Sequence, residues 1–584
     1  MLSLTIFLLL LSVCRGATVT YNWSIDFVNA APDNFTRQVI GINGAWPCPA
    51  IEATVGDTVV VVVTNNLGTQ STGLHFHGLN QFGTQVMDGP SGVTQCPIPP
   101  GATFTYTFNI DEPGTYWYHS HNMGQYPDGL RGPLIVHDPN DPYAGQYDEE
   151  FVLTLSDWYH TDAPTLIDQM FTTSNTHFLP PFPDALLVND SSSATLNFQA
   201  GKTYKIRIIS VAAFAAVMLQ FDSHTMRVIE IDGSYVQKHD AYQLRVAPAQ
   251  RYTVLLNAQT SVRRNYAFLA SLDENRDFST GGSTNVWPFN ISGTLLYDAS
   301  KGAAPAFSVP QWSPQDDATL VSLDNQALLG QPAVVDKSIT LDFNFGLDPT
   351  GIPRAYFNNI TYVPQKVPTL FTAFSTGSSN TNPLVYGAVN PFVVNRGDIV
   401  QIVVNNQDAA IHPFHLHGHQ FQVCERPASG KGVYTGKGRN FPAVPPKRDT
   451  VAVNANSYAV IRFQAENPGV WLFHCHIEWH VDMGLVATIV EIPQELAGLS
   501  IPADHLAACQ TQNIPTAGNA AGNTQNFTDL TGANTVPAFP DRGALYPRHL
   551  PQGGAVGAMA VKRREKRTAL ARRAAEFAQD DISL

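Results

Sequence analysis

Charged side chains are scarce in this sequence. Asp, Glu, Lys and Arg make up 14% of the 584 residues, whereas 43 Gly and 41 Pro are present. This composition favours many short strands joined by tight turns over long charged helices. Basic residues are the minority among the charges, and the formal net charge of −14 argues against nucleic acid or an anionic membrane as the main partner.

Long apolar runs are also missing. No stretch after the N-terminus reaches the roughly 20 apolar residues that a membrane helix needs, so we expect no transmembrane helix. The run from Leu2 to Val13 is too short to span a bilayer and is typical of a secretory signal, with cleavage before Ala17. We therefore expect residues 1–16 to be a signal peptide and the mature chain to be a secreted or cell-wall monomer. Glycosylation sequons that agree with export occur at Asn22, Asn34, Asn189, Asn290, Asn359 and Asn526.

Cysteines are few, and none are spaced as C-x₂-C pairs, which makes a zinc site improbable. Cys14 leaves with the signal peptide, so five cysteines remain. An odd number leaves one free thiol, which we assign to Cys475 because histidines surround it. The other four, Cys48, Cys96, Cys424 and Cys509, allow two disulfides in three connectivities.

The chain repeats itself over a long distance. GDTVVVVVTNN (56–66), LHFHG (74–78) and PGTYWYHSH (113–121) recur in the same order as GDIVQIVVNN (397–406), FHLHG (414–418) and PGVWLFHCH (468–476). Val, Thr, Tyr and Trp dominate these runs, and Gly, Pro and Asn bound them, which is typical of strands. The two segments are expected to be copies of one antiparallel sandwich with Greek-key wiring.

Residues 151–300 show the same alternation of strands and turns but contain no His-X-His pair. We therefore predict an all-β protein of three tandem β-sandwich domains. Their expected bounds are 17–150, 151–320 and 336–512, and residues 513–584 are expected to form a loose tail. The basic run KRREKR (562–567) near the end is read as a solvated tail or a processing site.

Each His-X-His unit places two imidazoles on one side of a strand, because residues i and i+2 share a face. The four units are His75/His77, His119/His121, His415/His417 and His474/His476. If the two repeats pack face to face, eight imidazoles meet at one seam, which suits a cluster of three metal ions. Imidazole binds copper, zinc, iron and nickel, so these pairs alone do not choose the metal.

Cys475 chooses it. The residue lies between His474 and His476, so its sulfur points to the opposite face of the strand. There it can meet His412 and His480, and two imidazoles with one thiolate form the trigonal set of a blue-copper site. Leu485 occupies the place of a weak axial ligand and cannot coordinate, which predicts a high potential; Met483 is the alternative.

HFHG, WYHSH, HPFHLHGH and HCHIEWH, in this order, resemble the four copper motifs of the multicopper oxidases, over residues 20 to 512. The resemblance implies three cupredoxin-like domains, four copper ions and the coupling of four one-electron oxidations to reduction of O₂ to water. It assigns His412, Cys475 and His480 to a type 1 copper, and His75 and His415 to type 2. The implied type 3 ligands are His77, His119, His121, His417, His474 and His476.

The same resemblance implies supporting residues. Asp88 and Glu478 match family acids that supply protons at the cluster, and they could equally be structural partners of ligand histidines. We expect His419 to be structural. TQCPI (94–98) resembles a segment that bridges to the end of the third domain, which implies Cys96–Cys509 and leaves Cys48 with Cys424.

The branches of this family differ in the small-molecule reductant that they oxidise. TQCPIPPG and NNQDAAIHPFHLHGH resemble iron-uptake ferroxidases and their pigment-forming relatives. Asp408 matches a ferroxidase carboxylate beside the type 1 histidine, or it is a turn acid. Asp273 or Asp277 falls near a second such position, and Asn197 stands where the ferroxidases have Glu. A neutral Asn binds a hard cation weakly.

On these grounds a secreted laccase-like oxidase of phenols or other aromatic reductants, including pigment precursors, is expected. A ferroxidase that oxidises Fe(II) is the first alternative. A copper-binding protein without turnover is the second.

Overall fold

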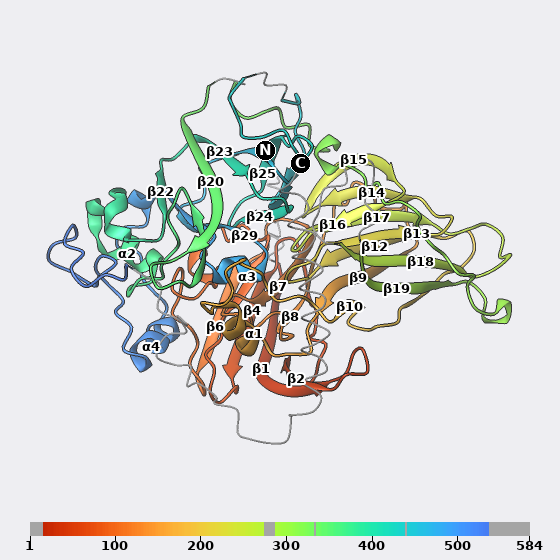
Figure 1. Ribbon diagram of the computed structural model, residues 1–584, viewed down its shortest axis with the longest axis horizontal. Helices are drawn as coiled ribbons and strands as arrows, with labels where there is room; N and C mark the ends of the chain where they lie inside the picture. The colour runs from red at the N-terminus through yellow and green to blue at the C-terminus, as the bar shows by residue number, and fades with distance from the viewer. Residues whose placement is uncertain (1–15, 274–285, 332–333, 438–440, 536–584) are drawn as a thin grey trace, which may run out of the picture. The chain divides into compact units, whose positions relative to one another are not determined.

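The structure is a computed structural model that describes residues 16–273, 286–331, 334–437 and 441–535 (Figure 1). The expected signal peptide up to residue 15, Asp277 and the basic run 562–567 lie outside the described residues. Within them, strands dominate and the helices are short. No described helix combines the length and the apolar character that crossing a membrane requires.

The first repeat forms two four-stranded sheets, in the orders β2-β1-β4-β6 and β3-β8-β7-β5. Val59, Val61 and Val63 of the predicted valine-rich strand are buried, and the residues between them are more exposed, so this strand shows the alternation of a sheet with one face in the core. The strands are β1 (Thr18–Ala30), β2 (Arg37–Ile42), β3 (Ile51–Thr54), β4 (Thr58–Asn65), β5 (Leu74–His77), β6 (Thr103–Asn109), β7 (Gly114–Ser120) and β8 (Arg131–His137).

The second repeat has the same wiring with longer sheets, β21-β20-β23-β28-β25-β26 and β22-β30-β29-β24-β27. β20 pairs with β21 and β23 as β1 pairs with β2 and β4, and β29 lies between β30 and β24 as β7 lies between β8 and β5. The elements are β20 (Lys337–Leu347), β21 (Pro353–Phe357), α2 (Thr369–Ser375), β22 (Pro391–Val394), β23 (Ile399–Asn406), β24 (His412–Leu416), β25 (Phe421–Glu425), β26 (Lys447–Arg448), β27 (Thr450–Val453), β28 (Ser457–Gln464), β29 (Gly469–Cys475), α3 (Glu478–Asp482), β30 (Val486–Glu491) and α4 (Ala503–Thr511).

The segment between the repeats is a third sandwich of the same kind, with sheets β10-β9-β12-β17-β14-β15 and β11-β19-β18-β13-β16. β9 pairs with β10 and β12, and β18 lies between β19 and β13, so the three-domain cupredoxin-like fold is confirmed. The elements are β9 (Glu149–Trp158), α1 (Ala163–Met170), β10 (Ala185–Val188), β11 (Thr195–Asn197), β12 (Thr203–Ser210), β13 (Val217–Phe221), β14 (Met226–Ile231), β15 (Ser234–Ala241), β16 (Leu244–Val246), β17 (Arg251–Asn257), β18 (Tyr266–Asp273) and β19 (Val286–Leu296).

The sandwiches differ from the expected antiparallel arrangement in one respect. β1 and β4 are parallel neighbours, as are β9 and β12, and β20 and β23. Each pair is joined by a crossover through the opposite sheet, because β3, β11 and β22 lie in the other sheet of their sandwich. The domain bounds drawn from the sequence stay predictions.

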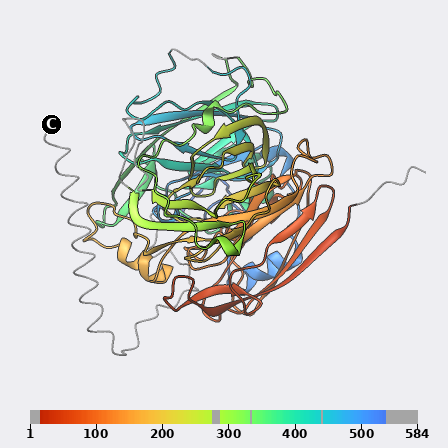
Figure 2. The same cartoon turned by 90° about the vertical axis from the view of Figure 1, so that its right-hand side faces the viewer.

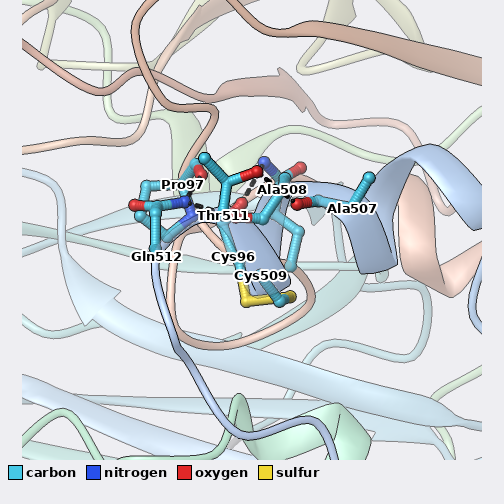
Figure 3. Close-up of a disulfide and its surroundings, with 8 residues drawn as sticks. Cys96, Pro97, Ala507, Ala508, Cys509, Thr511 and Gln512 are labelled. Carbon is cyan, nitrogen blue, oxygen red and sulfur yellow. Dashed lines mark hydrogen bonds between the residues drawn. A yellow bond between two sulfur atoms is a disulfide. The ribbon is translucent and has the colours of Figure 1, made fainter.

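The disulfide Cys96–Cys509 is present and joins residues 413 positions apart (Figure 3). Gln512 Nε2 donates to the carbonyl oxygen of Pro97, at 2.6 Å, beside the bridge. α4 itself packs on β6 of the first sandwich (Figure 2). There His505 stacks on Phe104 with ring centroids 3.8 Å apart. The disulfide therefore holds the end of the third domain on the first.

The second expected disulfide, Cys48–Cys424, is wrong. Both cysteines are free and buried in different cores: Cys48 packs in the first sandwich and Cys424 packs with Val403 and Val460 of the third. Burial raises the pKa of each thiol to about 12. Pairing by elimination failed because a buried thiol can simply act as a small apolar side chain.

Residues 513–535 are packed rather than loose. Asn519 and Ala520 are buried, and the amide N–H of Ala520 donates to the carbonyl oxygen of Val385 at 2.8 Å. Gln365 Nε2 donates to the carbonyl oxygen of Asn534 at 3.1 Å. The stretch is poor in apolar residues but satisfies its backbone groups against the third sandwich, which composition does not reveal.

Candidate metal centre

The four His-X-His units lie on, or end directly after, β5 and β7 of the first sandwich and β24 and β29 of the third. β5 pairs with β7 and β24 pairs with β29, and this register places His75 opposite His119, and His415 opposite His474. The ladders continue to the second histidine of each unit: His77 pairs with Trp117, and the N–H groups of His121, His417 and His476 donate to the carbonyl oxygens of Gly73, Leu472 and Pro413, respectively. Each sandwich therefore presents four imidazoles from two adjacent strands.

The two sets of four imidazoles meet face to face, as the sequence predicted. The ring centroids of His77 and His415 are 3.7 Å apart, and those of His75 and His417 are 4.1 Å apart. Further ring contacts across the seam join His121 to His474 at 5.4 Å and His119 to His476 at 5.3 Å. Three groups have ligand atoms close enough to hold an ion: His75, His77 and His119; His75, His415 and His417; His121, His417 and His474.

Most of these histidines use one ring nitrogen for a hydrogen bond to an oxygen of the protein. Nδ1 of His75, His119, His415 and His474 bonds the carbonyl oxygens of Asp88, Ser120, Asp449 and Cys475, respectively, at 2.7 to 2.9 Å. His77 uses Nε2 toward Asp449. These bonds fix the ring orientation and turn the other nitrogen toward the seam.

The free nitrogens suit a metal ion. Among the described residues, Nε2 of His75, His119 and His415 and Nδ1 of His77 are buried without a hydrogen-bond partner. Burial, with the neighbouring imidazoles, holds the pKa of His77 and His119 well below the usual value, so these rings are neutral and present lone pairs. Nε2 atoms of His417 and His474 are 3.1 Å apart. Two acceptor lone pairs at that distance repel unless they share a cation.

Cys475 lies on the other face of β29. Its Sγ is 3.8 Å from His412 Nδ1 and 3.5 Å from His480 Nδ1, and all three side chains are buried. Burial raises the pKa of the Cys475 thiol, so the thiolate requires a nearby cation. Leu485 and Met483 are both buried in the surrounding core, and the axial position stays a prediction.

Asp88 is fully buried between the two repeats. Its Oδ2 accepts from His417 Nδ1 at 2.9 Å, while its backbone oxygen accepts from His75 Nδ1 at 2.7 Å. The acid therefore contacts one imidazole from each sandwich. His419, expected to be structural, has Nε2 2.8 Å from Glu491 Oε2, away from the seam nitrogens.

Glu478 opens α3, two residues after His476. Its Oε1 accepts from the N–H of Gly124 at 2.8 Å, in the loop that follows His121. Burial raises the pKa of Glu478, and the nearby Asp482 adds to the rise. A carboxyl group whose pKa is raised suits proton supply.

Asp408 lies at the solvent edge of the type 1 set. Its Oδ2 accepts from His412 Nε2 at 2.9 Å, and its side chain is 40% exposed. Burial by itself raises the pKa of Asp408, but the hydrogen bond from His412, the charges of His412 and His480 and a backbone hydrogen bond together outweigh burial, and the pKa falls below the usual value. An ionised carboxylate thus connects the solvent with an imidazole of the type 1 set.

Asp273 is not available as a second carboxylate at that edge. It is fully buried, and its Oδ2 accepts from Arg245 Nε at 2.5 Å. Its N–H donates to Ala216, which packs against Ile411, the neighbour of His412. Asp273 is therefore engaged in an ion pair, and the alternative, Asp277, lies outside the described residues.

Asn197 is in the wrong place for the role that the sequence suggested. It pairs with Leu296 at the end of β19, whereas Asp273 pairs with Val286 at the beginning of that strand. The length of β18, roughly 25 Å at 3.4 Å per residue, separates Asn197 from the end that faces the type 1 set. The argument against iron from this position is wrong, because the match in a short motif did not fix the register.

Asp449 was missed by sequence reasoning. Its Oδ1 lies 3.1 Å from His77 Nε2 and 3.4 Å from His415 Nδ1. The three residues are close enough to share an ion, but Asp449 contacts the ring nitrogens opposite the free nitrogens His77 Nδ1 and His415 Nε2. The only signal was a lone Asp in KRDTVAV, between residues typical of strands.

The comparisons with known proteins agree with this geometry. Three profiles described as multicopper oxidase match residues 24–141, 149–288 and 362–495. The "Iron transport multicopper oxidase fetC" of Epichloe festucae is 49% identical over 532 residues, which is 90% of this chain and 85% of the relative. The "Iron transport multicopper oxidase FET3" of Saccharomyces cerevisiae is 39% identical, over 91% of this chain and 84% of the relative.

Two solved structures extend the likeness to the fold. The crystal structure of Fet3p, "a Multicopper Oxidase that Functions in Iron Import", matches with a TM-score of 0.83 and 38% identity, and covers 88% of this chain and 98% of that one. The laccase from Botrytis aclada matches with a TM-score of 0.73 and 30% identity, covering 85% and 92%. This chain therefore belongs to the multicopper oxidase family, with oxygen as electron acceptor and four copper ions as cofactors.

Proposed function

We propose that this chain is a ferroxidase. Four Fe(II) ions each give up one electron to become Fe(III), and one O₂ takes up the four electrons and four protons to form two waters. The relatives named iron transport multicopper oxidases and the likeness to Fet3p support this function.

The expected laccase-like oxidation of phenols and pigment precursors is wrong. The relatives at 39% to 49% identity are iron transport oxidases, and Fet3p matches with a higher TM-score and identity than the Botrytis laccase. The position that had argued against iron, Asn197, lies at the far end of its sheet from the type 1 set.

The observation that carries the proposal is the carboxylate of Asp408. A half-exposed oxygen ligand next to an imidazole of the type 1 set can hold a hard cation from solvent. A carboxylate favours Fe(III) over Fe(II) because it stabilises the higher charge more. The bond from His412 Nε2 to Asp408 then gives the electron a short path into the protein.

His412, Cys475 and His480 would hold the type 1 copper, and the eight seam histidines would hold the other three ions. The copper ions, when bound, supply the one-electron redox chemistry. The chain supplies the connection: the backbone of β29 links Cys475 to His474 and His476, which belong to the seam. Electrons that enter at one site therefore have a covalent path to the other.

Protons come from acids on two sides of the seam in this proposal. Asp88 contacts His417 and is fully buried, and Glu478 is buried with a raised pKa. The buried Glu478 is suited to donate a proton, while Asp88 is suited to orient His417 and His75.

We also infer that the protein acts outside the cell as a monomer on a small inorganic reductant, without a nucleic acid partner. The net charge of −14 supports attraction of cations and disfavours nucleic acid. Export would follow from the expected signal peptide at residues 1–16.

The test compares steady-state kcat/KM for Fe(II) and for a simple phenol. The wild-type chain is expected to prefer Fe(II), and Asp408→Asn is expected to lower the Fe(II) value about 10-fold or more, which is about 1.4 kcal/mol of transition-state stabilisation. The phenol value should change much less, because a neutral reductant gains little from the carboxylate.

Asp240→Asn is the matched control, since Asp240 is an exposed acid on β15 of the second sandwich. It should leave both values unchanged. A wild-type preference for the phenol would contradict the proposed function. An equal loss with both reductants in Asp408→Asn would contradict the proposed role of Asp408 alone.

A further inference from the structure

The second sandwich contributes none of the ligand histidines, yet one of its side chains reaches the seam. Arg251, the first residue of β17, is fully buried. Its Nε donates to the carbonyl oxygen of Thr115 in the first sandwich at 2.9 Å. Nη1 donates to the carbonyl oxygen of Ala249 at 2.9 Å, so the guanidinium is fixed from both sides.

The remaining donors of Arg251 hold Asp449 of the third sandwich. Nη1 donates to Oδ1 at 2.8 Å and Nη2 to Oδ2 at 2.5 Å, which is a bidentate pair. Both side chains are fully buried. A bidentate pair of this kind sets the plane of the carboxylate as well as its position.

Asp449 contacts two histidines from different sandwiches: its carboxylate contacts both rings, and its backbone oxygen hydrogen-bonds His415 Nδ1 at 2.9 Å. Asp449 Oδ1 is 3.1 Å from His77 Nε2 and 3.4 Å from His415 Nδ1, and the two rings stack with centroids 3.7 Å apart. The nitrogens on the far side of both rings are buried and have no hydrogen bond among the described residues. Asp449 therefore holds His77 through its carboxylate and His415 mainly through its backbone oxygen, which leaves the opposite nitrogen of each ring free for a metal ion.

The packing at Gly78 shows how closely this junction is built. Gly78 follows His77 with a φ of +96°, and a Cβ there would lie 2.6 Å from Arg251 Nη2 and 2.8 Å from Asp449 Oδ2. The ion pair between Arg251 of the second sandwich and Asp449 of the third therefore leaves room only for glycine at position 78. Three chain segments, one from each sandwich, converge at this point.

The other guanidinium beside this junction, Arg448, is engaged with a different acid. Asp232 Oδ1 is 3.7 Å from Arg251 Nη1 and is itself paired with Arg448, whose Nε lies 2.8 Å from Asp232 Oδ2. Positive and negative groups therefore alternate through the interior. Removal of the Arg251 charge would leave buried acids uncompensated, which destabilises proteins strongly.

We propose that Arg251 is a positioning residue for the copper cluster: through Asp449 it holds His77 and His415 with their free nitrogens toward the metal. The second sandwich, which has no ligand of its own, thereby shapes the cluster between the other two. This inference rests on the assignment of His77 and His415 as copper ligands made above, and it is independent of the reductant.

Arg251→Lys tests the proposal in the copper-loaded full chain, because lysine keeps the charge and loses the fork. We expect one of the four coppers to be removed by a chelator at a concentration about 10- to 100-fold lower than in the wild type. The electron paramagnetic resonance signal of the mononuclear copper at His415 should change. The visible absorption of the Cys475 site should not change.

The matched control is Arg207→Lys. Arg207 lies on β12, next to β17, is also buried, and donates from Nη1 to Thr115 Oγ1 at 2.8 Å, but it pairs with Glu150 rather than Asp449. A similar loss of stability with unchanged copper release is expected. The same copper release in both variants would overturn the proposal, because it would reflect general loosening of the interface.

Asp449→Asn provides a second measurement if Arg251→Lys does not fold. It keeps the volume of the side chain and breaks the bidentate pair from the other side. The same earlier release of one copper is expected. Unchanged release and an unchanged resonance signal in a folded variant of either residue would overturn the proposal. Neither readout depends on whether Fe(II) is the substrate.

Discussion

Cys475 shows how a single residue separates two metal sites. In β29 its side chain points away from those of His474 and His476, because successive residues of a strand face opposite ways. The sulfur therefore meets His412 and His480, while the two flanking imidazoles join the seam. The two sites are distinct in ligands but adjacent in the chain.

In the Cys475→Ser variant we expect the fold to be retained and electron entry to be lost. Serine is smaller and a poor copper ligand, so we expect loss of one copper per chain, loss of the visible absorption of the thiolate, and loss of turnover with Fe(II). The circular dichroism of the strands should be retained. Copper analysis, absorption and Fe(II) oxidation check this, and turnover in the serine variant would contradict the proposed route.

At the scale of elements, α4 is held by a neutral histidine. His505 is buried, stacks on Phe104, and has a pKa lowered to about 4 by burial, while Asp504 and the carbonyl oxygen of Thr105 act in the opposite direction. The helix is only nine residues long, so it depends on this contact and on the Cys96–Cys509 bridge for its position.

The pH dependence of this contact follows from the direction of the pKa shift of His505, which is downward. The unfolded histidine takes up a proton near pH 6.5 and the folded one only near pH 4, so stability is full above pH 6.5 and is lost as the pH falls to about 4. The loss is on the order of 3 kcal/mol. His505→Phe should keep the stacking and show a smaller decrease in Tm between pH 7 and pH 4.

His137→Phe is the control for this experiment, because His137 is largely exposed on β8. Its Tm should follow the wild type across the same range. Parallel Tm curves for wild type and His505→Phe would show that His505 does not titrate as inferred.

At the scale of the whole molecule, the cluster is a seam between duplicated sandwiches. His77 and His415 belong to repeats more than 300 residues apart in the chain, and each repeat supplies half of the imidazoles. Without metal, neutral rings face one another across the seam with free lone pairs. Copper binding is therefore coupled to the docking of the first sandwich on the third.

Removal of copper should lower the stability of this docking. A ligand that binds only the folded state adds about 4 kcal/mol when present at 1,000 times its Kd. We expect a clearly lower Tm for the copper-depleted chain by calorimetry, and recovery when copper is added back. Equal Tm values for the two forms would mean that the disulfide and Arg251–Asp449 fix the seam alone.

The limits of sequence reasoning are visible in particular residues. The His-X-His units and Cys475 were found because strand periodicity acts over two residues and needs no tertiary information. Asp449 was missed because its partners, His77 and Arg251, are about 370 and 200 residues away in the chain. Asn197 was misplaced because a motif match does not reveal which end of a strand it occupies.

By itself the sequence determined the strand-rich composition, the duplication, the histidine pairs and the sulfur between them, all of which follow from local spacing. The tertiary structure decided the rest: which acids reach the cluster, which cysteines pair, and what the second sandwich contributes. Cys48 and Cys424 lie in separate cores and Arg251 crosses to another sandwich. Such contacts depend on how the domains dock, and no local pattern of residues predicts which side chains then meet.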